Sequence, residues 1–291
     1  MSMPTMLRSA ALWKGARRCI SVPMGARAYR TTGIIIKRHK FGEADRLLTI
    51  FTLDYGKVRA IAKGAMRPGS KLGGNVELLT HSQLMLARGR NLDIVTQAQA
   101  LDIFLPMRDS LELMSCGFYL SELVDSFTEE NVEDSEMFGL FLDTLRGLSE
   151  TGESERLVRY FELRLLGHLG YSPQLHKCAN CNKVLQQETN YYNPAQGGML
   201  CRECGYPDMA AKSISVNAQK VLRLWQRSDF ATAGRVKLNA ELVREIKGIL
   251  RDTVRYVLEK QLKSIEWMDR LAGEGNLNGN KTISQNKDNS P

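Results

Sequence analysis

The chain has 291 residues, of which 43% are hydrophobic, so it is long enough to form more than one hydrophobic core. No apolar run approaches the roughly 20 residues that a transmembrane helix requires, which excludes a helical membrane protein. The net charge of +8 is uneven: residues 1–100 contain 17 Lys or Arg against 5 Asp or Glu, whereas residues 101–291 contain 23 against 27. A basic first third predicts a polyanion-binding face there and a different role for the rest.

The two ends of the chain are expected to lie outside the fold. Residues 1–30 contain six Lys or Arg and no acidic residue. Such a start is typical of organelle transit peptides, but we favour a disordered or misassigned leader, because translation from Met24 would remove most of it. Residues 272–291 are rich in Asn, Gly, Lys and Ser and contain no aromatic residue, which predicts a disordered tail.

Residues 31–104 contain short runs of β-branched and apolar residues separated by Gly, Asn and Asp turn residues. These runs predict strands near residues 33–36, 47–53, 57–63, 83–88 and 92–101. No long helical pattern lies between them. Five strands in so short a stretch predict a small antiparallel barrel as the first domain.

Basic residues are concentrated on this predicted barrel. Alternation along the third strand places Lys57, Arg59 and Lys63 on one face, which we expect to be exposed. The cations that we expect to contact nucleic acid are Lys37, Arg38, Lys40, Arg46, Lys57, Arg59, Lys63, Arg67, Lys71, Arg88 and Arg90. Such a surface would follow a phosphate backbone and release counterions on binding. The alternative is a solvated charged face without a ligand.

After Pro106 the apolar periodicity becomes helical. Helices are predicted near residues 113–127, 135–148, 155–168 and 216–227, followed by a long final helix that begins after an Asn239 N-cap and extends to Leu262. Cys116 falls on the apolar face of the first helix, so we interpret it as a core thiol. These segments assign residues 105–173 and 206–271 to one helical domain and make the fold class α+β.

Cys178-Ala-Asn-Cys181 and Cys201-Arg-Glu-Cys204 form two Cys-x-x-Cys pairs. Two such pairs at this separation predict a structural zinc site with four thiolate ligands, in a ribbon over residues 174–205 that is inserted in the helical domain. A catalytic zinc would keep an open position for water, and four thiolates leave none. Redox dithiols are the remaining alternative, although the chain lacks the framework of a secreted disulfide protein.

The sequence contains no pattern of a known catalytic site. The phosphate loop Gly-x-x-x-x-Gly-Lys-Ser/Thr and the motif Gly-x-Ser-x-Gly are both missing, and the four His residues are scattered. We therefore expect a protein that is not an enzyme.

Four motifs resemble those of the RecO family of bacterial recombination mediators. They are Gly42-Glu43-Ala44-Asp45-Arg46, Tyr55-Gly56-Lys57, Ala62-Lys63-Gly64-Ala65-Met66-Arg67 and Leu166-Gly167-His168-Leu169-Gly170-Tyr171. The resemblance covers about residues 31–271. It implies that the barrel is an oligonucleotide-binding (OB) fold that binds single- and double-stranded DNA, and that the protein anneals complementary strands in DNA repair.

The resemblance also implies partners. They are RecR and the single-stranded DNA-binding protein (SSB), with RecA loaded onto SSB-coated DNA as the indirect result, in the bacterial cytoplasm at the nucleoid. The acidic, apolar SSB tail is expected to dock on the helical domain, where Arg156, Arg159 and Arg164 are candidates to receive it. Two other hypotheses stay open: a zinc-ribbon adaptor that binds only proteins, and a nuclease.

Overall fold

The computed structural model describes residues 27–258, so the expectations for residues 1–26, for Leu262 and for the tail lie outside the described residues. Five strands open the chain: β1 (Ala28–Phe41), β2 (Asp45–Thr52), β3 (Gly56–Ala62), β4 (His81–Ala87) and β5 (Asp93–Asp102). They form a closed barrel in the order β1-β2-β3-β5-β4. The predicted barrel is confirmed, with one correction: β3 and β5 close it as a parallel pair.

The first strand is longer at its start than the sequence indicated. Residues 28–30 belong to β1, where Ala28 pairs with Ala87 and Arg30 pairs with Met85 of β4. Placing these three residues in a leader is therefore wrong. These residues are Ala28, Tyr29 and Arg30, and the Tyr29 side chain is buried in the barrel core.

A β-bulge interrupts the alternation of β1. Ile35 pairs with Ile50 and Lys37 pairs with Thr49, so Ile36 has no partner on β2 and the register shifts. A bulge places two consecutive residues on the same face of a strand. Ile36 and Lys37 therefore both face outward, and Arg38 turns toward the end of the barrel, beside Leu48, its buried partner on β2.

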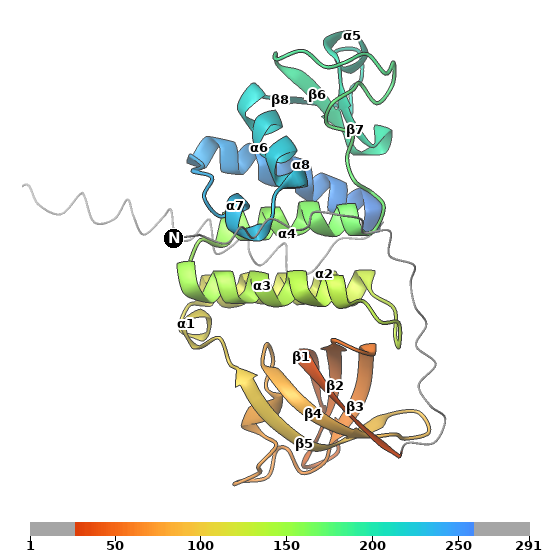
Figure 1. The fold of residues 1–291 in the computed structure, drawn as a ribbon, viewed down its shortest axis with the longest axis vertical. Helices are drawn as coiled ribbons and strands as arrows, with labels where there is room; N and C mark the ends of the chain where they lie inside the picture. Colours follow the sequence, from red (N-terminus) through yellow and green to blue (C-terminus); the bar gives the residue numbers. More distant parts are fainter. Residues whose placement is uncertain (1–26, 259–291) are drawn as a thin grey trace, which may run out of the picture.

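The helices follow the barrel. They are α1 (Leu105–Arg108), α2 (Leu111–Phe127), α3 (Ser135–Thr151), α4 (Ser154–His168), α5 (Arg202–Gly205), α6 (Val216–Arg227), α7 (Phe230–Ala233) and α8 (Ala240–Leu258). Asn239 caps α8 as predicted, since its Oδ1 accepts a hydrogen bond from the amide of Leu242 at 2.8 Å. Figure 1 shows α2 and α3 as a layer against the barrel, with α4, α6 and α8 beyond it. The α+β fold class is confirmed.

A small sheet lies between α4 and α6 in the sequence and at the far end of the molecule from the barrel (Figure 1). Its strands are β6 (Asn190–Asn193), β7 (Gly198–Leu200) and β8 (Lys212–Ile214), in the order β7-β6-β8. The sequence predicts a ribbon over residues 174–205, which ends before β8. The third strand is a correction, because β8 pairs with β6 through Asn190 and Ile214.

Lys57 joins the barrel to the helical layer. Its ammonium lies 3.1 Å from Oδ1 of Asp125 and donates a hydrogen bond to the carbonyl oxygen of Asp125 at 2.6 Å. Only 8% of Lys57 is exposed, so the expectation that it shares an open surface with Arg59 and Lys63 is wrong. The outward face of β3 at this position is covered by α2, which sequence alternation alone does not reveal. Burial by itself would raise the pKa of Asp125, but hydrogen bonds from Lys37 and Lys57 hold that pKa below its ordinary value.

We predict that Lys57→Met lowers the free energy of unfolding by about 1 to 2 kcal/mol, because the Asp125 carbonyl loses its donor. The loss stays moderate because Lys37 also pairs with the Asp125 carboxylate, at 2.5 Å. Urea unfolding measures the change. Lys40→Met is the control, since Lys40 is exposed and its replacement should change stability by less than about 0.5 kcal/mol. Equal effects of the two variants would contradict the assignment of Lys57 to the contact between barrel and helices.

Candidate nucleic-acid interface and metal centre

The outer faces of β1, β2 and β3 form a continuous surface. Lys37, Thr49 and Arg59 lie side by side in one row across these strands, and His39, Leu47 and Ile61 lie in the next. Eight of the predicted cations are exposed: Lys37, Lys40, Arg59, Lys63, Arg67, Lys71, Arg88 and Arg90. Within residues 27–258, only Lys37 among these eight has a carboxylate within 4 Å. The other seven have no carboxylate within 4 Å in the part of the chain that the structure describes.

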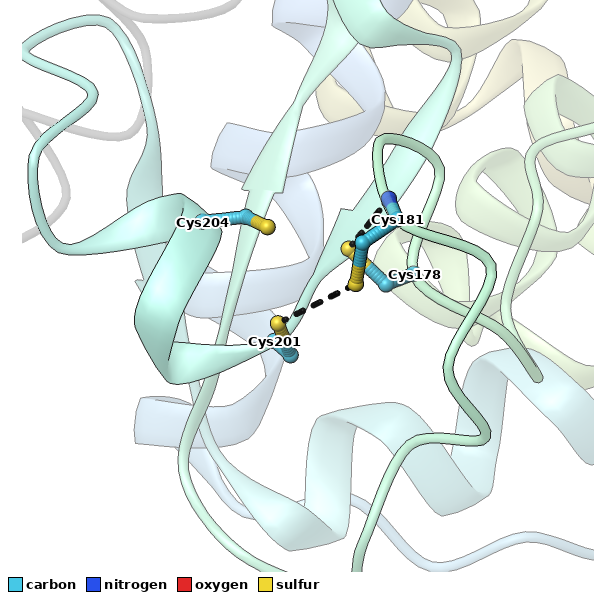
Figure 2. Close-up of side chains that lie close together, drawn as sticks. All are labelled: Cys178, Cys181, Cys201 and Cys204. Atoms are coloured by element: carbon cyan, nitrogen blue, oxygen red, sulfur yellow. Dashed lines mark hydrogen bonds between the residues drawn. The ribbon is translucent and has the colours of Figure 1, made fainter.

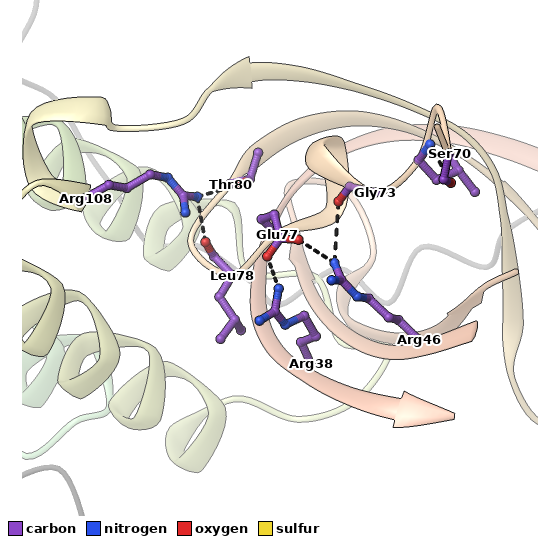
Figure 3. Close-up of polar contacts among 9 residues, drawn as sticks. Arg38, Arg46, Ser70, Gly73, Glu77, Leu78, Thr80 and Arg108 are labelled. Carbon is purple, nitrogen blue, oxygen red and sulfur yellow. Dashed lines mark hydrogen bonds and ion pairs between the residues drawn. The ribbon is translucent and has the colours of Figure 1, made fainter. Parts of the chain in front are cut away.

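Arg38 and Arg46 differ from those eight because the protein itself engages them. Both guanidinium groups pair with the carboxylate of Glu77, Arg46 at 2.5 Å from its Oε1 (Figure 3). Arg108 lies nearby and donates hydrogen bonds to the carbonyl oxygen of Leu78 at 2.7 Å and to Thr80 Oγ1 at 2.8 Å. This arginine cluster lies at the end of the barrel where the connection from β3 to β4 crosses it.

The hairpin between β4 and β5 carries Arg88 and Arg90. The guanidinium of Arg88 lies 5.1 Å from the ring centroid of Tyr29, and the Tyr29 hydroxyl donates a hydrogen bond to Asp93. Burial, followed by that hydrogen bond to Asp93, raises the pKa of Tyr29 far above its ordinary value, so the ring stays neutral. The hairpin is therefore fixed to the barrel and presents Arg88 at a defined place.

A second basic surface lies on α6 and was missed in the sequence. Lys220, Arg223 and Arg227 recur at intervals of three and four residues, which places them on one helix face. Arg227 Nη2 lies 2.8 Å from Nε2 of His176, and Arg223 Nε donates to the carbonyl oxygen of Leu175 at 2.7 Å. The net charge of residues 101–291 is negative, so a count of charges does not indicate this cluster. The helical spacing of the three cations does indicate it.

Cys178, Cys181, Cys201 and Cys204 converge although the first pair lies in a loop and the second pair at the start of α5 (Figure 2). Their four Sγ atoms all lie within 4.8 Å of one another, and Cys181 Sγ is 3.7 Å from Cys201 Sγ. Thiolates bound to zinc at about 2.3 Å in a tetrahedron are separated by about 3.8 Å. The donor set therefore fits zinc. In residues 27–258 this is the one group of three or more His, Cys, Asp or Glu that could hold a metal ion.

Local backbone geometry explains why the thiols face one another. Asn182 adopts φ = 60°, and its amide donates to the carbonyl oxygen of Cys178 at 2.9 Å, which closes the first turn. The second pair begins α5, where the amide of Gly205 donates to the carbonyl oxygen of Cys201. Burial would raise the pKa of Cys178, but amide donors, that of Cys181 foremost, lower it to about 6 and favour the thiolate. His176 contacts Arg227 and is not part of the cluster.

The three arginines of α4 have different surroundings. Arg159 is 1% exposed, and its Nη1 lies 2.9 Å from Oε1 of Glu162, so the expectation that it receives a partner's tail is wrong. It lies on the face of α4 that packs against α2, where Glu162 also accepts a hydrogen bond from Tyr119. Arg156 is largely covered and pairs with Glu153. The pair of Arg159 and Glu162 is buried and closed to a partner, whereas Glu153 of the other pair is half exposed.

Arg164 is the one of the three that lines a cavity. The cavity has a volume of about 430 Å³ and lies between α3, α4 and the start of α7. Its wall includes Met137, Leu140, Tyr160, Arg164, His168 and Phe230. The Arg164 guanidinium is 6.0 Å from the centroid of the Tyr160 ring and donates to the carbonyl oxygen of Ser228 at 3.3 Å. The cavity thus combines apolar walls with two basic residues, Arg164 and His168, and three acidic ones, Glu136, Asp143 and Asp229.

His168 supplies a pH-dependent contact at the edge of this cavity. Its Nε2 lies 2.8 Å from Oδ2 of Asp134, and its Nδ1 is 3.5 Å from Oε2 of Glu136. The hydrogen bond with Asp134 is the main cause that raises the pKa of His168. The protonated ring therefore stabilises the fold fully below the unfolded value of about 6.5, and this contribution disappears as pH rises through the higher folded pKa.

We predict that His168→Gln lowers the free energy of unfolding by about 0.5 to 1 kcal/mol at pH 6. At pH 9 the difference from wild type should fall toward zero. Urea unfolding at the two pH values measures it. A difference that is the same at both pH values would contradict an ionic role for His168.

Among residues 27–258, no helix is long and apolar enough to cross a bilayer. Comparison with known proteins gives two matching family models: Recombination protein O N terminal over residues 24–104 and Recombination protein O C terminal over residues 108–266. A DNA repair protein RecO from Dehalococcoides mccartyi strain CBDB1 is 40% identical over 243 residues, covering 84% of this chain and 96% of its own. Another from Roseiflexus sp. strain RS-1 is 42% identical over 246 residues, covering 84% and 87%. A third from Desulforamulus reducens is 33% identical over 243 residues, covering 84% and 94%.

Proposed function

The chain belongs to the RecO family of DNA repair proteins, and from that premise we propose that it is a recombination mediator that binds single- and double-stranded DNA and anneals complementary strands. The observation that supports this most is the set of seven exposed barrel cations that have no carboxylate partner among residues 27–258. Uncompensated Lys and Arg on one domain attract a phosphate backbone, with an affinity that depends on salt.

The proposed mechanism is not enzymatic. The barrel cations neutralise the phosphates of two strands and lower the repulsion between them, so that complementary bases pair. The basic face of α6 holds a further segment of DNA, and the metal ion, which we propose is zinc, fixes the loops beside that helix. Zinc supplies no catalysis here, because four thiolates fill its coordination shell.

We assign the cavity between α3, α4 and α7 to the C-terminal tail of SSB. That tail is acidic and apolar, and the cavity offers Arg164 beside Met137, Leu140 and Phe230. His168 is paired with Asp134 and Glu136, and Asp143 and Asp229 also line the wall, so the assignment depends on Arg164. RecR is the second protein partner that we propose, and loading of RecA onto SSB-coated DNA is the proposed outcome. These activities place the protein in the bacterial cytoplasm at the nucleoid.

Annealing of two complementary labelled strands that are precoated with SSB tests the proposed function. We expect annealing that weakens as salt increases, while a denaturing gel shows both strands intact. Metal-dependent loss of a strand would favour a nuclease instead. Absence of annealing together with retained SSB binding would favour an adaptor that binds only proteins.

The cavity assignment has its own test. We predict that Arg164→Glu lowers the affinity for an acidic, apolar SSB tail peptide by about tenfold or more, since it places a carboxylate where the peptide needs a cation. Fluorescence anisotropy measures the affinity. Arg255→Glu is the matched control, because Arg255 is exposed on α8 and is not among the residues that line the cavity. Equal effects of both variants would remove the cavity from the proposal.

A further inference from the structure

Two arginines at one end of the barrel share a single carboxylate. Arg38 of β1 and Arg46 of β2 both pair with Glu77, which lies on the β3–β4 segment, defined as residues 63–80 (Figure 3). The side chains of Arg38 and Glu77 are each about one-third exposed, at 32% and 33%, and that of Arg46 is 16% exposed. The group is therefore open to solvent on one side, and two positive charges oppose one negative charge.

This arrangement resembles an occupied anion site. A guanidinium group binds carboxylate and phosphate with the same planar donor geometry. Burial lowers the pKa of Arg46 first, and repulsion by Arg38 lowers it further, so the pair favours any anion that lies between them. Lys40 pairs with Arg46 across β1 and β2 and is exposed beside the site, and Lys63 follows directly after β3. Lys40 and Arg46 lie on the opposite strand face from the outward row of Lys37, Thr49 and Arg59, so the site adds a basic patch at the end of the barrel.

The β3–β4 segment does not need the Glu77 ion pairs to stay in place. Neutral backbone hydrogen bonds hold it at both ends, from the Met66 amide to the Ala44 carbonyl and from the Leu79 amide to the Ile35 carbonyl, both at 2.9 Å. Val76 and Leu79 are buried in the barrel core and the helical core, respectively. Rotation of the Glu77 side chain alone would therefore free both arginines without unfolding the segment.

We propose that Arg38 and Arg46 form a binding site for a backbone phosphate of single-stranded DNA, and that Glu77 occupies this site until the phosphate displaces it. The inference rests on the proposed DNA binding by this barrel and adds a particular subsite with a built-in competitor. Glu77 sets the affinity of the barrel, because each strand that binds must replace the carboxylate. The competing explanation is that Glu77 only stabilises the fold.

The test is the affinity of Glu77→Gln for a labelled oligothymidylate, measured by fluorescence anisotropy across a salt series. Removal of the competing charge is expected to tighten binding about five- to tenfold at 0.1 M salt, and the plot of log affinity against log salt should become steeper by about 0.7, the contribution of one single-strand phosphate contact. Glu77→Asp, which keeps the charge on a shorter side chain, should give an intermediate gain. It also replaces Glu77→Gln as the deciding variant if the latter does not fold.

Glu43→Gln is the matched control. Glu43 is exposed in the turn between β1 and β2 of the same domain, so its replacement removes the same charge and should change affinity less than twofold. In an Arg38→Gln and Arg46→Gln background, Glu77→Gln should bring no gain. If wild type binds DNA in a salt-sensitive way but both Glu77 variants bind it equally or more weakly, the subsite proposal is wrong and the proposal of DNA binding by the barrel stands. Absence of DNA binding by wild type would overturn both proposals.

Discussion

Simultaneous charge reversal of Arg59, Lys63 and Arg67 is expected to weaken binding of a short single strand by about 100-fold or more at 0.1 M salt. The three side chains are exposed and have no carboxylate partner within the described residues. Every phosphate that the protein no longer neutralises reduces the slope of log affinity against log salt by about 0.7. The triple variant should therefore bind weakly. Its slope of log affinity against log salt should also be shallower than that of wild type by about two.

The control for this prediction reverses Arg244 and Arg255, which are exposed on α8 in the helical domain. It reverses two charges where the barrel variant reverses three, and it leaves the barrel unchanged, so affinity should fall only a few-fold. Thermal unfolding verifies that both variants keep the wild-type fold, as expected for surface substitutions. If the α8 variant lost as much affinity as the barrel variant, total charge rather than the barrel surface would govern binding.

Replacement of Cys178 by Ser is expected to abolish metal binding and to unfold the ribbon. Metal analysis should find about one zinc per wild-type chain and none in the variant, since three thiolates hold the ion far less tightly. Structural zinc sites contribute apparent free energies of about 10 to 16 kcal/mol in small zinc-binding peptides, so the loss is large. Leu175, Tyr192 and Met199 of this region are part of the helical core, and the damage should therefore extend to the melting temperature of the whole chain.

Cys116→Ala separates metal loss from loss of a core thiol. Cys116 is buried between the helices, far from the cluster in sequence, and burial raises its pKa to about 12. This variant should lose some stability and keep its zinc. A Cys178→Ser variant that keeps a full equivalent of zinc, with an unchanged pattern of limited proteolysis over residues 174–205, would contradict the four-thiolate site.

Features that depend on local spacing could be predicted from the sequence. The two Cys-x-x-Cys pairs indicate one site because each pair needs only its own turn to direct two thiols to the same point. The five strand signals and the Asn239 cap are local in the same sense, and the structure confirms them. The domain boundaries inside the helical region, by contrast, stay predictions. Local spacing does not show where the ribbon ends, since β8 follows the predicted ribbon in sequence and still joins its sheet.

Features that depend on tertiary packing could not be predicted. Alternation along β3 places Lys57 beside Arg59 correctly, but only the docking of α2 buries the first and leaves the second exposed. The bulge at Ile36 turns Arg38 toward Glu77, and no residue type in β1 signals it. Arg159 is an arginine on a helix with a charged face, yet its partner Glu162 is buried with it. In each case a neighbouring element decides the role.

The most direct test of DNA binding by the barrel is a titration of the wild-type chain with a labelled oligothymidylate at several salt concentrations. Seven barrel cations have no carboxylate partner within the described residues. They predict that the logarithm of the binding constant falls linearly with log salt, with a slope of about −2 or steeper if three or more phosphates are contacted. Affinity that is negligible at 0.1 M salt, or that does not change with salt, would contradict the assignment of the barrel surface to a phosphate backbone.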